Sequence, residues 1–188
     1  VNAEGIKIHG YELQDGSRAA EVILKEVRLD SSALIGQAGQ ALASIQNAIA
    51  VANVALVAET TGLLRALLAA TQEYMQTRKQ FGVALATFQT VQHRLADMAI
   101  AAEEVEAMAL RAAIDFQKND LQLRLKRASG AKAFVAEKSR LVGQEAIQLH
   151  GGIGVTDELN VAHFFKRDTT INMTYGDEDY HLQRYSDL

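Results

Sequence analysis

The sequence predicts a mainly α-helical protein, an up-down helical bundle that is preceded by a short segment of β-structure. Two observations lead to this fold class. The first 36 residues carry apolar side chains in alternation, whereas apolar residues from position 40 onward recur at the spacing of a helix face. The first helical stretch, residues 40–77, is also long for a globular helix, and such length is typical of bundles.

The N-terminal segment is predicted to form two strands, at residues 7–13 and 20–29. In the second strand, Val22 and Leu24 lie on the same face. Asp15–Gly16 lies between the two stretches and is a turn signal. The segment therefore reads as a strand pair that precedes the bundle.

The rest of the chain is predicted to be helical. Thr87 is the expected N-cap of the second helix, and Thr156 or Asp157 that of the fourth, because their side-chain oxygens can accept backbone N–H groups. Gly151 is expected to end the third helix. The predicted helices span residues 40–77, 87–118, 122–149 and 160–168, and a last helix begins near residues 176–179. The core face of the second helix is predicted to include Val91, Leu95, Met98, Ala102, Val105 and Leu110.

Composition excludes several classes of function. The chain has no cysteine, so disulfides, thiolate metal sites and cysteine nucleophiles are ruled out, and we expect a cytoplasmic location. The net charge of −4 comes from interspersed charges with no basic stripe, which argues against nucleic acid as a partner. The five histidines show no metal-binding spacing, so no metal site is predicted.

The most apolar stretch, residues 41–58, is predicted to be a buried helix of a soluble bundle and not a membrane span, because it contains Ser44, Gln46, Asn47 and Asn53. The N-terminal residues lack the basic segment and apolar core of a signal peptide. The chain has no proline, although average usage of about 5% would give it about nine, and it begins abruptly in a strand. We therefore expect a piece of a longer polypeptide.

A first motif surrounds the end of the first long helix, at residues 78–82 (RKQFG), with Gln89 eleven residues after the arginine. This segment and its spacing resemble those of acyl-CoA dehydrogenases. The resemblance implies that Arg78 contacts the pyrophosphate of FAD and that Phe81 and Gln89 line the nucleotide. A guanidinium suits this role because it makes forked, charge-assisted hydrogen bonds to phosphate, each worth roughly 1.5–3 kcal/mol. The alternative role for Arg78 is a cation that interacts with the dipole of a helix C-terminus.

A second motif follows the third long helix, at residues 148–154 (QLHGGIG). A Gln-x-x-Gly-Gly-x-Gly segment in this place again resembles acyl-CoA dehydrogenases, in which the loop meets the FAD of a neighbouring subunit. Glycines permit close approach of the backbone to a cofactor, or a positive φ. The resemblance implies that Gln148, Gly151 and Gly152 contact FAD, while the alternative for Gly151 is an ordinary helix end. His150 is predicted to be packed and not catalytic.

The third segment, residues 174–184, departs from the family pattern. Many acyl-CoA dehydrogenases carry Tyr-Glu-Gly-Thr here, and that glutamate removes the α-proton of the substrate, but Gly176 stands in its place when Tyr175 is aligned. Counting back from the Leu-Gln-Arg sequence implies one extra residue, so Asp177 is the first candidate base and Glu178 the second. The alternative is that both acids stabilise a helix N-terminus.

The resemblance covers the chain from about Ala19 onward and implies two domains, residues 1–36 as the end of a middle β-domain and residues 37–188 as a C-terminal helical domain. It implies FAD-dependent oxidation of an acyl-CoA thioester to the trans-2-enoyl-CoA, with an electron-transfer flavoprotein as acceptor. It also implies a homotetramer, built as a dimer of dimers, or a hetero-oligomer, because FAD is shared between subunits. The isolated chain is expected to be inactive because it lacks the part of the family fold that cradles the flavin ring.

Other functions stay open at this point. A non-catalytic partner subunit of a hetero-oligomeric dehydrogenase would explain the glycine at position 176. An acyl-CoA oxidase, which passes electrons to oxygen, would use the same segments. A cofactor-free interaction bundle fits the alanine-rich helices, but it leaves the pairing of the two motifs unexplained.

Overall fold

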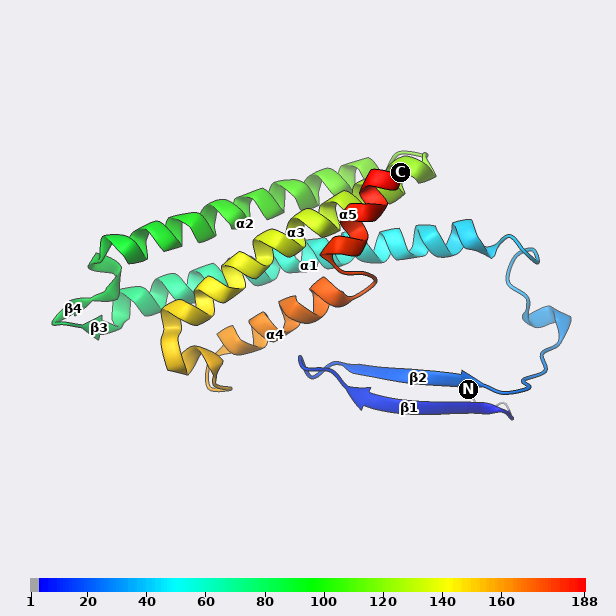
Figure 1. The fold of residues 1–188 in the computed structure, drawn as a ribbon, viewed down its shortest axis with the longest axis horizontal. Helices are drawn as coiled ribbons and strands as arrows, with labels where there is room; N and C mark the ends of the chain where they lie inside the picture. The colour runs from blue at the N-terminus through cyan, green and yellow to red at the C-terminus, as the bar shows by residue number, and fades with distance from the viewer. Residues whose placement is uncertain (1–3) are drawn as a thin grey trace.

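The computed structural model describes residues 4–188 and shows a helical bundle with a β-hairpin beside it (Figure 1). Residues 1–3 of the predicted N-terminal segment lie outside the described residues, and the division at residues 36 and 37 stays a prediction. The long helices run in alternating directions, which confirms the predicted fold class. They are α1 (Ala41–Thr77), α2 (Gln89–Phe116) and α3 (Leu121–His150), against which α4 (Asn160–Met173) and α5 (Glu178–Asp187) pack.

The N-terminal hairpin pairs β1 (Ile6–Glu12) with β2 (Arg18–Leu24) as antiparallel strands. The predicted strand pair is confirmed, but the second strand ends at Leu24, five residues earlier than the sequence predicts. The cause is Glu26, whose φ of 52° lies outside the extended region. The chain then reaches α1 through a short 3-10 turn, η1 (Ser31–Ala33).

The turn of this hairpin is tied to the bundle by Arg167 of α4. Its Nη1 donates to Asp15 Oδ2 at 2.9 Å, and its Nε and Nη2 donate to the two carboxylate oxygens of Glu59 in α1 at 2.7 and 3.0 Å. Burial raises the pKa of Asp15, but hydrogen bonds from Ser17 and Arg167 outweigh it and bring the pKa down to about 2. The predicted turn at residues 15 and 16 is confirmed, and a partly buried charge network ties it to the bundle.

The core lies where α1, α2 and α3 meet, and much of it is alanine. Small side chains at the contact let the helix axes approach closely. Leu64, Leu67 and Met98 provide the larger side chains, and all three are fully buried. The buried apolar residues of this core are Val57, Leu64, Leu67, Met98, Ala101, Ala102, Val105, Ala109, Ala112, Ala131, Val135, Val142, Ala146 and Val161.

The predicted core face of α2 is correct over its middle but not at its end. Met98, Ala102 and Val105 are buried as predicted, whereas Leu110 is 59% exposed. Leu110 follows Val105 by five residues, which places it about 140° around the helix. The buried apolar positions of α2 beyond Val105 are Ala109 and Ala112.

The predicted helix caps are wrong at two helices. Phe88 precedes α2 and Leu159 precedes α4, and neither side chain accepts a backbone hydrogen bond. The hydroxyls of Thr87 and Thr156 instead donate to carbonyls three residues earlier, at 2.7 and 2.8 Å. Asp157 forms an ion pair with a lysine of α4. The two threonine hydroxyls are used by the 3-10 turns η2 (Leu85–Thr87) and η3 (Gly151–Val155). As a result α2 begins two residues later than predicted, whereas α4 begins at the predicted residue.

By length and composition alone, α1 is apolar enough to cross a membrane. It is also the helix that α2, α3 and α4 all contact. Asn53, Thr60 and Thr71 are buried on it, and the Thr71 hydroxyl donates to the Leu67 carbonyl at 2.7 Å. Polar residues thus lie on the face that meets the other helices. The prediction that residues 41–58 form a buried helix is wrong over most of that stretch, where Ala50, Asn53 and Val57 are buried but apolar side chains such as Leu42 and Ile45 are exposed.

Candidate functional site

The chain leaves α1 through a small hairpin that carries the first motif. Arg78 is the C-cap residue of α1, and β3 (Lys79–Gln80) then pairs with β4 (Val83–Ala84). Phe81 and Gly82 form the turn with φ values of 53° and 83°. Positive φ at both central residues defines a type I′ turn, whose twist matches that of the flanking strands.

Phe81 stands at the tip of this hairpin, and 91% of its surface is exposed. Its ring meets the ring of Phe88 edge-on, with the centroids 6.2 Å apart. A positive φ is strained for a bulky side chain, and such strain is concentrated at functional sites. The hairpin therefore presents an aromatic ring that can contact a group outside residues 4–188.

The polar side chains predicted to contact the cofactor are also exposed. Arg78, Gln89 and Gln148 lie on the surface. Within residues 4–188, none of these side chains makes a hydrogen bond or an ion pair. Arg78 therefore keeps all the donors of its guanidinium for an anion, and its place at the end of α1 satisfies the alternative helix-dipole role at the same time.

The glycine loop begins where α3 ends. Gly151 has a φ of 65° and closes the helix, as predicted, with its N–H bonded to carbonyls of the last turn. A methyl group placed on Gly151 or Gly152 would meet no heavy atom of residues 4–188 within 4 Å. On Gly154 it would lie 2.8 Å from the Cβ of His150, so that glycine is required by the local fold. The first two glycines thus leave their backbone open to approach.

The two motifs lie at the same end of the bundle (Figure 1). Tyr74, one turn before the end of α1, stacks on His150 at the end of α3, with the ring centroids 4.5 Å apart and the planes at 19°. His150 is 5% exposed, and its Nδ1 lies 2.8 Å from the Ala146 carbonyl, which places the proton on that nitrogen. The prediction that His150 is packed is confirmed, and the stack brings the arginine hairpin and the glycine loop together.

The connection between α4 and α5 carries the candidate base. Tyr175 has a φ of 58° and Gly176 a φ of 114°. A methyl group on Gly176 would come within 2.3 Å of Cδ1 of Tyr180 and 3.1 Å of Nε2 of His181. The family glutamate is therefore missing at position 176, and the backbone and its neighbours also leave no room for a side chain there.

The two candidate carboxylates have different surroundings. Asp177 is exposed and is the N-cap of α5, with Oδ1 accepting from the Tyr180 N–H at 2.9 Å. Glu178 is half-buried and is paired with Arg140 of α3. The helix-terminus role predicted as the alternative is thus observed for Asp177. Its second oxygen makes no hydrogen bond within residues 4–188 and remains free to accept a proton.

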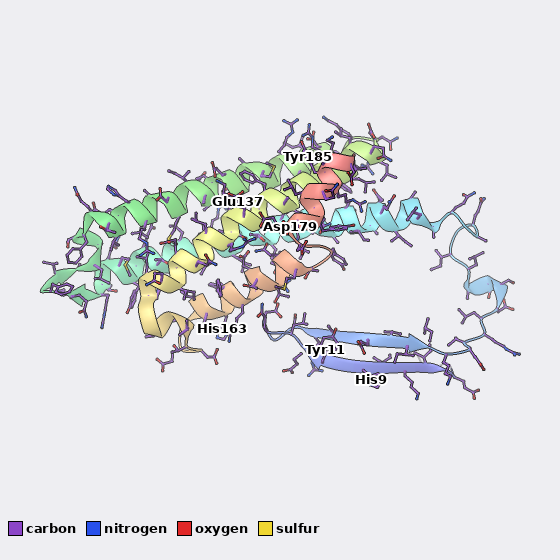
Figure 2. The ribbon with its side chains drawn as sticks, in the orientation of Figure 1. His9, Tyr11, Glu137, His163, Asp179 and Tyr185 are labelled. Carbon is purple, nitrogen blue, oxygen red and sulfur yellow. The ribbon has the colours of Figure 1, made fainter. Side chains whose placement is uncertain are left out.

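A cavity of about 490 Å³ lies beside this connection, between α3, α4 and the start of α5. Asp179, at the start of α5, is one of the residues that line this cavity, and it is labelled in Figure 2. The 14 residues of α4 separate this region from the glycine loop. At about 1.5 Å per residue they span roughly 20 Å. The structure therefore brings the predicted cofactor residues together at one end of the bundle and places the two carboxylates apart from them.

Known proteins match over the same residues. The family model described as the C-terminal domain of acyl-CoA dehydrogenase matches residues 39–186. YngJ of Bacillus subtilis, a probable acyl-CoA dehydrogenase, is 32% identical over 90% of this chain and 43% of its own length. The (R)-benzylsuccinyl-CoA dehydrogenase of Thauera aromatica is 36% identical over 76% of this chain and 35% of its own length. The chain belongs to the acyl-CoA dehydrogenase family.

Solved structures of this family have the same fold. Butyryl-CoA dehydrogenase of Megasphaera elsdenii matches with a TM-score of 0.90 at 23% identity, over 99% of this chain and 49% of its own. The Tcur3481–Tcur3483 steroid acyl-CoA dehydrogenase matches, as a variant, with a TM-score of 0.84 at 30% identity, over the same shares. The predicted family is confirmed, and this acyl-CoA dehydrogenase chain spans less than half the length of the curated relatives it matches.

Sequence reasoning missed a buried polar group under the α4–α5 connection. Lys132 of α3, Asp168 of α4 and His181 of α5 are each 1–2% exposed. A signal was present for Lys132, since it follows Ala128 by four residues and precedes Val135 by three, on the buried face of α3. No sequence signal linked it to the connection, whose contacting residues lie 40 or more positions later.

Proposed function

We propose that this chain is the FAD-binding and base-bearing part of an enzyme that oxidises an acyl-CoA thioester to the trans-2-enoyl-CoA. The observation that carries the proposal is the shared location of the arginine hairpin and the glycine loop, both with exposed groups that have no partner within residues 4–188. A bundle without a cofactor gives no reason to hold Phe81 exposed with a positive φ.

The cofactor end fits FAD in three ways. Arg78 offers a fork of N–H donors that matches the pyrophosphate. Phe81 and Gln89 offer a ring face and an amide to the nucleotide, while Gly151 and Gly152 let the backbone come close. Gln148 adds a second amide at the start of the loop. When bound, FAD supplies the acceptor for the hydride that leaves the β-carbon of the substrate.

At the other end, Asp177 is proposed as the base that takes the α-proton. Its Oδ1 is held by the Tyr180 N–H, which orients the carboxylate and leaves the second oxygen available. An aspartate is one methylene shorter than the family glutamate, so the one-residue shift past Gly176 must place its backbone correctly. Glu178 is the second candidate, although its pairing with Arg140 occupies its carboxylate.

The cofactor role is tested by replacing Arg78 with methionine in the full-length protein and titrating the flavin-free form with FAD. Each charge-assisted hydrogen bond contributes roughly 1.5–3 kcal/mol, so loss of even one should raise the Kd for FAD about 10- to 150-fold. The matched control is Arg65→Met, since Arg65 lies on the same helix and pairs with Glu106 of α2. An unchanged Kd in the Arg78 variant would reject the assignment.

The base is tested with Asp177→Asn, because asparagine caps helices as well as aspartate and should preserve the start of α5. Loss of turnover with FAD retained is expected. Asp179→Asn is the control, because Asp179 is exposed in the same helical turn. Thioesters with ring-bearing acyl groups belong in the substrate panel, since two relatives at or above 30% identity are named for a benzylsuccinyl-CoA and a steroid substrate.

The second candidate function is a non-catalytic partner subunit, and the geometry at Gly176 favours it, because no side chain fits there. In that case Asp177→Asn should leave the turnover of the assembled enzyme almost unchanged, while Arg78→Met still weakens FAD binding.

Electron-transfer flavoprotein is the proposed acceptor for the first function. Reduction of oxygen without that acceptor would identify an oxidase instead. A cytoplasmic homotetramer stays the expectation for the assembled protein.

A further inference from the structure

Lys132 is the largest side chain among those that are almost completely buried, with 1% exposure. It lies in the middle of α3, a helix that contacts every other α-helix named above. A buried ammonium is costly unless hydrogen bonds and opposite charges compensate it. What compensates it therefore indicates why a lysine stands there.

The ammonium is bonded to the two ends of the α4–α5 connection. Its Nζ lies 3.2 Å from the carbonyl oxygen of Asn172 and 3.2 Å from that of Gly176. Asn172 is in the last turn of α4, where carbonyls have no partner within the helix and carry the negative end of its dipole. Gly176 directly precedes Asp177. One cation thus joins the end of α4 to the residue before the proposed base.

The connection needs such support because its own backbone is strained. Tyr175 has a φ of 58°, which is strained for a residue with a side chain, and strained backbone persists only where the surroundings hold it in place, whereas glycine at position 176 accepts its positive φ without strain. On the α5 side, the Asp177 carboxylate and carbonyl accept from the N–H groups of Tyr180 and His181 at 2.9 and 3.1 Å. On the α3 side, Lys132 provides the hold.

The charged groups around Lys132 agree with this role. Burial lowers its pKa to about 8, while Asp168 and Asp177 oppose that shift, so the ammonium form persists at neutral pH. Burial raises the pKa of Asp168 to about 6 against the hydrogen bonds it accepts, one of them from Asn172 Nδ2 at 3.2 Å. Burial lowers the pKa of His181 to about 4, so its ring is neutral and adds no second cation.

We propose that Lys132 is a positioning residue, which fixes the backbone of residues 174–177 from the side of α3 and so sets the position of the Asp177 carboxylate. This inference rests on the proposed function in one respect, since only a catalytic Asp177 makes the fixed connection matter for turnover. The hold on the backbone is a separate statement about the fold, and it is measured separately.

The test uses the full-length, FAD-loaded enzyme and Lys132→Met, which keeps an unbranched chain of similar length and removes both hydrogen bonds. Amide hydrogen exchange of residues 174–181 should accelerate about tenfold or more. The kcat should fall about 10- to 100-fold, as expected for a misplacement near 1 Å, with KM for the acyl-CoA within about twofold and flavin absorbance unchanged. Lys138→Met is the matched control, because Lys138 lies on α3 and pairs with Glu104 of α2 instead of with the connection.

Unchanged exchange in Lys132→Met would overturn the inference, and so would accelerated exchange with full kcat while Asp177→Asn is inactive. If Asp177→Asn is fully active, the proposed base falls, but the exchange result still decides whether Lys132 holds the connection. Should the methionine variant fail to fold, Lys132→Gln keeps one N–H donor group without the charge. The same exchange and kcat measurements then decide, with a smaller acceleration expected than for a complete loss of the bonds.

Discussion

Replacement of Gly176 by alanine tests the geometry of the α4–α5 connection directly. A residue with a side chain at a left-handed φ costs roughly 1–2 kcal/mol, and the φ of Gly176 is 114°. The added methyl would lie 2.3 Å from Cδ1 of Tyr180, so the ring must turn away and lose its edge contact with His181, whose centroid is 5.1 Å distant. Overpacking of this kind costs about 1–3 kcal/mol.

The sum is about 2–5 kcal/mol of unfolding free energy. For a chain of this size each kcal/mol shifts the Tm by about 2–4 °C, so Gly176→Ala should unfold roughly 4–20 °C below the parent protein. The assay is thermal unfolding followed by circular dichroism, repeated in the Tyr180→Ala background. Removal of the ring should recover the steric part and leave only the cost of the backbone, about 1–2 kcal/mol.

Gly62→Ala is the control variant, in which the unfolding free energy is expected to rise instead of fall. Gly62 lies inside α1, and an added methyl there would meet no heavy atom of residues 4–188 within 4 Å. Alanine in a helix interior is favoured over glycine by about 0.5–1 kcal/mol, so this variant should be more stable than the parent. If Gly176→Ala were to unfold at the same temperature as Gly62→Ala, the geometry of the connection described above would be incorrect.

Two further predictions concern charge and strain. Hydrogen bonds from Arg111 and then Lys118 lower the pKa of Asp115 to about 2, so between pH 4 and 2 the unfolded chain binds more protons than the folded one and stability falls as the pH falls. Asp115→Asn should flatten this decline in urea unfolding, and an unchanged slope would exclude Asp115 as its source. Phe81→Gly should raise the unfolding free energy by up to about 1 kcal/mol, because it relieves a positive φ at an exposed position, while it weakens FAD binding. If Phe81→Gly lowers both the unfolding free energy and the affinity for FAD, the ring supports the fold.

The sequence predicts the long helices and the two motifs because these depend on local pattern. The glycine stop after α3 and the turn at Asp15–Gly16 are where predicted, since backbone freedom at glycine is a property of the residue itself. The pairing of β3 with β4 is not predicted, because a turn that begins with phenylalanine at a positive φ contradicts its own local preference.

The caps and the buried lysine could not be predicted for a different reason. Thr87 and Thr156 have good capping side chains, but neighbouring 3-10 turns use their hydroxyls. The partners of Lys132 lie on a connection that only the tertiary fold brings under α3. Leu110, by contrast, could have been excluded from the core, because at about 100° per residue it lies roughly 140° from Val105 on the exposed side of α2.

The guanidinium of Arg167 connects the hairpin to the bundle through ion pairs and not through packed apolar side chains. It is planar, and both carboxylate oxygens of Glu59 fix its orientation in the bundle, while a single hydrogen bond joins it to Asp15 of the hairpin turn. The strands beyond the turn are largely exposed within residues 4–188, so little apolar surface would be uncovered if they swung. Partial burial of the pairs limits screening by salt. A single Arg167→Met substitution therefore removes the ion pair between the hairpin turn and the bundle together with the pair that joins α4 to α1.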